Sequence, residues 1–326
     1  MLYSPLIGDL VSSANWGDPE ENMKSMIYYG IKYVDQALRG IDFRNGELIG
    51  IQAEAKNRKS TMLANLVLNV APKLKDTWIC IDTLESGMPP ETYRDVLIAI
   101  LATRIIIKNH FGERSDWPDY QTISRVCDLV ISKEFLWLSK RTPEQEWAIE
   151  AAKNYLAKLP IMIFGAAYKQ GNARDFEATM ARWRALAEGK CPGLEGYICK
   201  LFACDHIQQL DPFGISDYAG MEKVVGEYGK FIAQTKSVII AVSQLSITSV
   251  RGEREGLGRA TAKGGAKLEA EANVLFRTKY SQRENYKLVI ETCATRRQPP
   301  PTVVQELDPQ SGAFLRPAYL IGDSNE

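Results

Sequence analysis

The segment from Ala53 to Thr61 has the layout of a loop that binds phosphate groups. It reads AEAKNRKST, follows the apolar run ELIGIQA and precedes the apolar helical run MLANLVLNV. Such a strand–loop–helix unit holds phosphate with backbone N–H groups, a lysine and the positive end of a helix dipole, while a hydroxyl reaches Mg²⁺. Lys59 and Ser60 stand where this chemistry requires them. The sequence therefore predicts a nucleotide site, with ATP and Mg²⁺ as its ligands.

This loop departs from the usual pattern because it contains no glycine. The motif GxxxxGK[ST] requires glycine where this chain has Ala53 and Arg58. A basic helix start without a ligand is therefore the alternative interpretation. Extra cations beside Lys59 can offset backbone strain through charge-assisted contacts to phosphate. We expect the site to bind Mg-ATP with the whole loop and helix start, namely Ala53, Lys56, Asn57, Arg58, Lys59, Ser60 and Thr61.

Polar side chains follow three further apolar runs, where strands of an open α/β sheet present their ligand-binding edge. Glu85 comes after TWICID, and a carboxylate there can polarise a water for attack on a phosphate. Asp205 follows LFAC, and an acid in that position can hold Mg²⁺ through water. Ser243 and Gln244 follow SVIIAV and are suited to sensing a γ-phosphate. A solvated loop glutamate and a helix-capping aspartate are the alternatives for the two acids.

A basic, glycine-rich segment follows Gln244 directly. Residues 246–267 carry five basic side chains against two acids and contain five glycines. A mobile basic loop in that position can follow the phosphates of single-stranded DNA, whereas an ordinary solvated loop is the alternative. The segment has no aromatic residue, so we expect backbone tracking rather than base stacking. The predicted DNA contacts are Arg251, Arg254, Arg259 and Lys263, followed by Lys267.

The elements that must position these residues alternate between short apolar runs and amphipathic stretches, which predicts a mostly parallel α/β sheet. The expected strands cover 47–53, 77–82, 160–165, 198–204, 237–242, 272–280 and 286–293, of which the last two are expected as antiparallel additions; the last one leads into TVVQEL and a turn, DPQSGAF. The expected helices cover 18–29, 60–70, 89–108, 144–158, 174–188 and 218–235. Residues 108–145 read as a helical insertion.

Composition describes an ordinary globular protein of 326 residues, with 45% hydrophobic and 25% charged side chains and a net charge of zero. Nucleic-acid binding must therefore come from a local basic patch. No apolar run is long enough to span a membrane, and the N-terminus lacks the pattern of a signal peptide. Six cysteines without a CxxC pair argue against a zinc site and for a reducing cytoplasm.

The chain resembles the motor domain of DnaB-family replicative helicases, a RecA-like ATPase fold. The resemblance covers roughly residues 28–316 and rests on GIKYVDQALRGIDFRNGELIGIQA, TLES, CDHIQQL, SQL, KGGAKLEAEANVLFR and ETCATRRQPPPTVVQELDPQSGAFL. It implies a catalytic role for Glu85, a magnesium role for Asp205 and a γ-phosphate sensor role for Gln244. Arg296 and Arg297, in the final hairpin, would reach the nucleotide of a neighbouring subunit, so a ring, most simply a hexamer, is implied.

The departures from that family keep other functions open. Besides the missing loop glycines, Thr295 stands where the family has a lysine, and Arg296 is the candidate to compensate. A weak or inactive RecA-fold ring or partner protein in replication is one alternative, and a recombinase-like ATPase is another. We expect an arm at 1–29 and one ATPase domain at 30–326. A primase or loader is the expected partner, and the compact layout suggests phage or plasmid replication.

Overall fold

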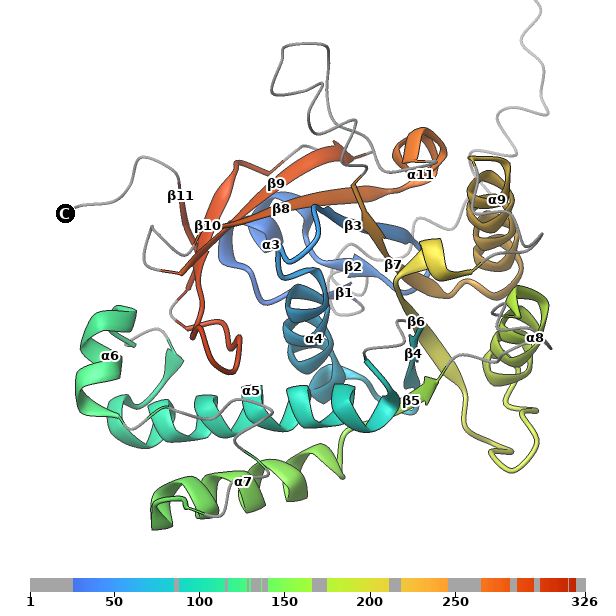
Figure 1. Ribbon diagram of the computed structural model, residues 1–326. Helices are drawn as coiled ribbons and strands as arrows, with labels where there is room; N and C mark the ends of the chain where they lie inside the picture. The colour runs from blue at the N-terminus through green and yellow to red at the C-terminus, as the bar shows by residue number, and fades with distance from the viewer. Residues whose placement is uncertain are drawn as a thin grey trace, which may run out of the picture.

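A computed structural model describes most of the chain. The described residues are 26–84, 88–114, 117–127, 129, 136, 140–165, 175–210, 218–245, 265–281, 286–295, 300–315 and 317–320. They form the mostly parallel α/β architecture that the sequence predicts, which confirms the fold class (Figure 1).

One mixed sheet organises the described residues, with strand order β11-β10-β9-β8-β3-β7-β6-β4-β5. Six neighbouring strands from β8 to β5 run parallel, and β9, β10 and β11 continue the sheet antiparallel. The bounds are β3 Leu48–Ala53, β4 Trp78–Thr83, β5 Ile161–Gly165, β6 Cys199–Asp205, β7 Val238–Gln244, β8 Val274–Ser281, β9 Lys287–Thr295, β10 Val303–Glu306 and β11 Tyr319–Leu320. A separate pair joins β1 Met26–Ile27 to β2 Ile41–Asp42.

Helices cover both faces of the sheet, so the fold has three layers. One apolar cluster joins one face of the sheet to α3 Lys32–Leu38, α4 Lys59–Val70, α5 Pro90–Phe111, α6 Tyr120–Val126 and α7 Pro143–Leu156. A second cluster joins the other face to α8 Phe176–Ala187, α9 Tyr218–Thr235 and α11 Gly265–Glu271. Figure 1 shows α4 at the centre of the molecule, α5 and α7 below it, and α8 and α9 at the right.

The burial of the central strands explains why the sequence predicted them correctly. Every residue of β3 is buried, and so is every residue of β7 except its last. A parallel strand covered on both faces reads as a continuous apolar run rather than as an alternating one. The helix at 143–156 begins with an equally readable signal, because Thr142 and Gln145 form a reciprocal capping box before Pro143.

One expectation about secondary structure was wrong, and another was correct only in part. Residues 26–27 form a short strand, and 28–31 are not helical, so the helix expected at 18–29 does not extend into the described residues. The strand expected at 272–280 as an antiparallel addition pairs in parallel with β3 on one side, and it pairs antiparallel only with β9, in the predicted hairpin. Antiparallel pairing starts one strand later, at β9.

The region expected as a helical insertion at 108–145 is helical in its described part. The helix α5 runs on to Phe111, and α6 follows at 120–126. Both pack into the same apolar cluster as α4, through side chains such as Ile107 and Ile123. No helix among the described residues is both long and apolar enough to cross a membrane.

The half-buried carboxylate of Asp35, in the first turn of α3, shapes the chain just before this helix. Asp35 accepts hydrogen bonds from the backbone N–H groups of Tyr29, Gly30 and Ile31, at 2.6, 2.9 and 2.9 Å. Burial raises the pKa of Asp35 to about 6, against these three donors and Lys73, which lower it. The turn also requires glycine, since Gly30 has φ +80° and a Cβ there would lie 2.3 Å from the Asn69 amide nitrogen.

Candidate nucleotide-binding site

The loop between β3 and α4 has the predicted strand–loop–helix geometry. Ala53 ends β3 fully buried, and Lys59 begins α4. Within the loop, Lys56 and Arg58 adopt left-handed backbone conformations, with φ of 63° and 58°. Left-handed residues alternating with right-handed ones turn backbone N–H groups into a concave anion-binding nest. The loop therefore turns through two left-handed positions, which a lysine and an arginine occupy although glycine adopts this conformation most easily.

The side chain of Arg58, whose backbone is left-handed, makes two contacts with the rest of the protein. Its guanidinium lies over the ring of Tyr280, 4.9 Å from the centroid, and Nη2 donates to the carbonyl of Pro309 at 3.1 Å. A left-handed non-glycine residue costs about 1–2 kcal/mol. A cation–π contact contributes about 0.5–2 kcal/mol and a hydrogen bond about 1 kcal/mol. The two contacts are thus large enough to offset the strain.

Asn57 fastens the same loop to β8. Its side-chain oxygen accepts from the backbone N–H of Tyr280 at 2.8 Å, and its backbone carbonyl accepts from the Thr278 hydroxyl at 3.1 Å. The predicted loop residues Asn57 and Arg58 therefore both contact β8. The loop is held by the sheet on its carboxyl side as well as by β3.

Lys59 and Ser60 occupy the first turn of α4. The ammonium of Lys59 donates to the carbonyl of Glu54 at 3.2 Å, so this side chain folds back along the loop. Ser60 and Thr61 are half-buried in the same turn, and Lys56 is exposed. These positions place a cation and hydroxyl groups at the positive end of a helix of 12 residues.

A buried network ties α4 to the C-terminal turn. The Asn65 amide donates to the carbonyls of Thr61 and Gly312, and its oxygen accepts from Phe314 N and from Arg104. Burial lowers the pKa of Arg104 to about 9. A Cβ at Gly312 would lie 2.6 Å from Cγ2 of Thr61, so the turn touches the first turn of the helix.

Polar side chains at the carboxyl ends of three strands share the α4 face of the sheet. Thr83 of β4 pairs in register with Asp205 of β6, and Gln244 of β7 pairs with Ala53 of β3. Alternate residues of a strand point to the same face, so Asp205 follows Leu201 and Ala203 and Gln244 follows Val242, all on the face that α4 covers. Asp205 and Gln244 are therefore brought to the loop's side of the sheet.

Asp205 is almost completely buried, with 2% of its surface exposed. The pKa of Tyr93, in the first turn of α5, is raised well above its ordinary value by burial and then by the charge of Asp205. The carboxylate thus lies beside α5 as well as α4, in surroundings where a bound cation would interact strongly with it.

Several predicted site residues lie outside the described part of the chain. They are Glu85, the DNA-contact residues Arg251, Arg254, Arg259 and Lys263, and the two arginines Arg296 and Arg297. The residues next to them are described. Leu84 N donates to the carbonyl of Asp205, β7 runs to Gln244 and β9 runs to Thr295. Lys267 lies in α11 and pairs with Glu271 at 3.1 Å.

Sequence reasoning missed the residues that support the site. Asn65, Arg104 and Tyr280 carry no motif, because their contacts join segments 39 to 249 residues apart. Gln208 also escaped notice, although it stands within CDHIQQL. A polar side chain in the middle of an apolar helix, as Asn65 is in MLANLVLNV, was the one available signal.

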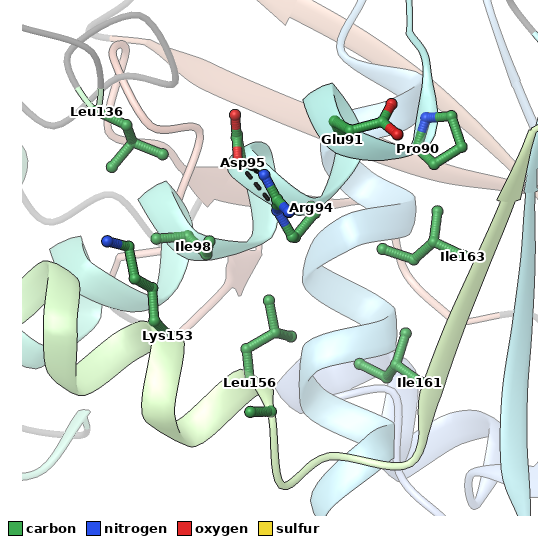
Figure 2. A pocket seen from close by; sticks show the side chains of 11 residues that line it. Pro90, Glu91, Arg94, Asp95, Ile98, Leu136, Lys153, Leu156, Ile161 and Ile163 are labelled. Carbon is green, nitrogen blue, oxygen red and sulfur yellow. Dashed lines mark hydrogen bonds and ion pairs between the residues drawn. The ribbon is translucent and has the colours of Figure 1, made fainter.

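A cavity of about 610 Å³ lies elsewhere, between α5, α7 and the edge strand β5. Figure 2 shows Ile161 and Ile163 on one side and Leu156 and Lys153 on another. Arg94 also lines it and pairs with Asp95 at 3.1 Å, as the dashed lines in Figure 2 mark. No residue of the phosphate-binding loop lines it, and β5 is separated from β3 by three strands.

Comparisons with known proteins agree on the fold. No protein-family profile and no curated protein matches the chain. Among solved structures, the ATPase domain of G40P aligns at a TM-score of 0.65 and 16% identity, over 96% of both chains. A DnaB-like replicative helicase, described with its interactions with primase, aligns at 0.68 and 16% identity, over 97% of this chain and 67% of that one.

A more distant likeness points to the same fold class. The KaiC-like protein PH0186 from Pyrococcus horikoshii aligns at a TM-score of 0.51 and 12% identity, over 90% of this chain and 99% of that chain. The chain therefore has the RecA-like fold of DnaB-type helicase motor domains, as its sequence motifs predicted.

Proposed function

We propose that this chain is an ATP-driven DNA helicase motor of the DnaB type, which moves along single-stranded DNA as a ring. The observation that carries the proposal is the glycine-free loop, which still turns through left-handed residues into a helix that begins with Lys59 and Ser60. That geometry fits the phosphates of a nucleoside triphosphate, because it offers backbone N–H groups, a cation and hydroxyls at a helix N-terminus.

The proposed roles follow the chemistry of each group. The loop Ala53–Thr61, with Lys56, Asn57 and Arg58, surrounds the phosphates, and Lys59 neutralises their charge. Ser60 and Asp205 would hold Mg²⁺, which supplies charge stabilisation to the transferring phosphoryl group. Asp205 suits this role as a buried carboxylate on the α4 face of the sheet.

Hydrolysis requires a water aligned with the γ-phosphorus. Glu85, which follows β4 after Leu84, orients that water and accepts its proton as the bond to the leaving ADP breaks. Gln244 senses the γ-phosphate from the end of β7. Arg296 and Arg297 complete the site of a neighbouring subunit, where added positive charge accelerates phosphoryl transfer.

The surroundings of the motor belong to the same proposal. Arg251, Arg254, Arg259 and Lys263 contact the DNA backbone, and residues 1–29 form an arm before a single ATPase domain at 30–326. A hexamer is the expected assembly, with a primase or loader as partner. The expected setting is the bacterial cytoplasm, in phage or plasmid replication.

The test is ATP hydrolysis with and without single-stranded DNA. The wild type should hydrolyse ATP and be stimulated by DNA, and Lys59→Ala should lose roughly a hundredfold or more, as for the removal of other transition-state charge stabilisers. Lys32→Ala is the matched control, because Lys32 also begins a helix after a loop. It should hydrolyse ATP like the wild type.

A second candidate function is favoured by one specific observation. The guanidinium of Arg58 contacts Tyr280 and the carbonyl of Pro309, so protein groups engage this cation of the loop. A loop held in this way suits a structural ring or helicase partner that does not hydrolyse ATP. Calorimetry that detects no binding at millimolar ATP would favour that function over the motor.

A further inference from the structure

The strand that carries Gln244 loses its neighbour before it ends. Pairing between β6 and β7 stops at Cys204 and Ala241, three residues before Gln244. Beyond Asp205 the chain turns away into the short helix η4, Ile207–Gln209. The last residues of β7 therefore face a place in the sheet where β6 no longer continues.

The orientation of the β7 backbone determines which groups face that place. Ile239 N donates to Glu47 O and Leu245 N donates to Ala53 O, so the odd-numbered residues bond toward β3. Successive residues of a strand bond in opposite directions, so the N–H and C=O groups of Gln244 point toward the missing continuation of β6. Because Gln244 is half-buried at the end of an otherwise buried strand, its backbone groups require a hydrogen-bond partner in that position.

The side chain of Gln208 fills the position. Its oxygen accepts from Gln244 N at 3.1 Å, and its nitrogen donates to Gln244 O at 3.1 Å. The same nitrogen donates to the Ser243 hydroxyl at 2.6 Å. A primary amide presents a donor and an acceptor side by side, so it pairs with a peptide unit as a strand residue would.

These bonds hold the backbone of Gln244 while its side chain stays on the α4 face. Gln208 makes two hydrogen bonds to the backbone of Gln244 and one to the hydroxyl of Ser243. Together they fix the position of the Gln244 Cα, from which its side chain extends. A side chain that must meet a γ-phosphate within hydrogen-bond distance depends on such support from the residues behind it.

We infer that Gln208 is a positioning residue, which aligns Gln244 so that the site distinguishes ATP from ADP. This inference rests on the proposed function, since it needs a nucleotide in the loop and a sensor at Gln244. The inference gives the side-chain amide of Gln208 a part in distinguishing a nucleoside triphosphate from a diphosphate. The hydrogen bonds of this amide described above go to Ser243 and Gln244 of β7, not to the phosphate-binding loop or to α4.

The experiment compares the affinities of the full chain for a non-hydrolysable ATP analogue and for ADP. Both ligands use the phosphate-binding loop, so general damage to the site cancels in the ratio of the two dissociation constants. Gln208→Leu should reduce the preference for the ATP analogue by about tenfold, the effect expected when roughly one hydrogen bond's alignment is lost. Gln244→Ala should reduce it similarly, and the double variant should lose no more than either.

Gln209→Leu is the matched control. Gln209 is the same residue type in the same turn, also half-buried, and its amide lies 3.2 Å from the ring Nε2 of His206 instead of β7. The preference of the Gln209→Leu variant for the ATP analogue over ADP should equal that of the wild type. Gln208→Glu serves if the leucine variant does not fold, because it keeps length and one acceptor but loses both donations.

The outcomes separate this inference from the proposed function. A wild-type preference that Gln244→Ala abolishes and Gln208→Leu or Gln208→Glu leaves unchanged would overturn the positioning role alone. Equal losses in the Gln208 and Gln209 variants would overturn it too, since the effect would belong to the turn in general. A wild type that binds neither nucleotide would overturn the proposed function and this inference together.

Discussion

The guanidinium of Arg58 lies over the ring of Tyr280, with 4.9 Å between the guanidinium carbon and the ring centroid. These two residues are 222 positions apart, and their contact joins the phosphate-binding loop to β8. The position of Arg58 is one where phosphate loops use glycine. Arg58, which stands in place of this glycine, therefore also attaches the loop to the sheet through its contact with Tyr280.

The first prediction separates strain from attachment at this position. Arg58→Ala keeps a left-handed non-glycine residue and loses both contacts, so its unfolding free energy should fall by about 1–3 kcal/mol. Arg58→Gly loses the same contacts and also relieves the strain, so it should be more stable than Arg58→Ala by about 1 kcal/mol. Denaturant unfolding measures both.

The same pair of variants has a consequence for hydrolysis. Glycine lets the backbone approach phosphate closely, so Arg58→Gly should hydrolyse ATP at the wild-type rate or faster. If the alanine and glycine variants are equally stable, the left-handed backbone carries no strain. If Arg58→Gly abolishes hydrolysis, the guanidinium has a direct role at the phosphates.

A second prediction concerns the basic segment after β7. Neutralising Arg251, Arg254 and Arg259 together should weaken binding of single-stranded DNA and reduce its logarithmic salt slope by about 2, because up to three fewer counterions are released. Hydrolysis without DNA should survive and its stimulation by DNA should disappear. The control neutralises Lys108, Lys190 and Lys230, which are exposed on described helices and a turn. Wild-type DNA binding by the triple arginine variant would contradict the assignment.

A third prediction concerns assembly. If Arg296 and Arg297 act on a neighbour's nucleotide, replacing both with alanine should abolish hydrolysis but not nucleotide binding. Mixing that double variant with Lys59→Ala should restore part of the activity, since an intact loop then meets intact arginines from the next subunit. Sedimentation should show a ring. A strict monomer with full DNA-stimulated activity would contradict the prediction.

The sequence predicted the sheet well because its central strands are buried on both faces. Runs such as SVIIAV carry their own signal, and polar residues such as Asp205 stand out where such a run stops. The spacing of Lys59 and Ser60 after β3 predicted the loop for the same reason, since strand, loop and helix are consecutive in the chain.

Contacts between distant segments could not be predicted in this way. The contacts of Arg58 with Tyr280 and Pro309 could not be predicted, because these partners lie more than 200 residues away in the chain. The strand at 26–27 was predicted as helix because its pairing with 41–42 depends on a turn around Asp35. A local sequence pattern carries no information about tertiary contacts with segments that are distant in the sequence.

The last prediction concerns Asp35 and the pH dependence of stability. Burial raises the pKa of this carboxyl from 3.8 to about 6, even though three backbone N–H groups lower it. Between pH 4 and 6 the folded state therefore holds the proton that the unfolded state has released. The unfolding free energy contributed by Asp35 should fall as the pH rises through this window, by about 3 kcal/mol for roughly two pKa units.

Asp35→Asn cannot titrate, so its unfolding free energy should fall less steeply than that of the wild type between pH 4 and 6. It should also be less stable at pH 4, because one amide oxygen replaces two carboxyl oxygens as acceptor for three N–H groups. Asp42→Asn is the control, since Asp42 also accepts three hydrogen bonds but in an exposed turn. Denaturant unfolding across the window measures the difference in slope, and parallel curves for Asp35→Asn and the wild type would show that Asp35 keeps its ordinary pKa in the folded chain.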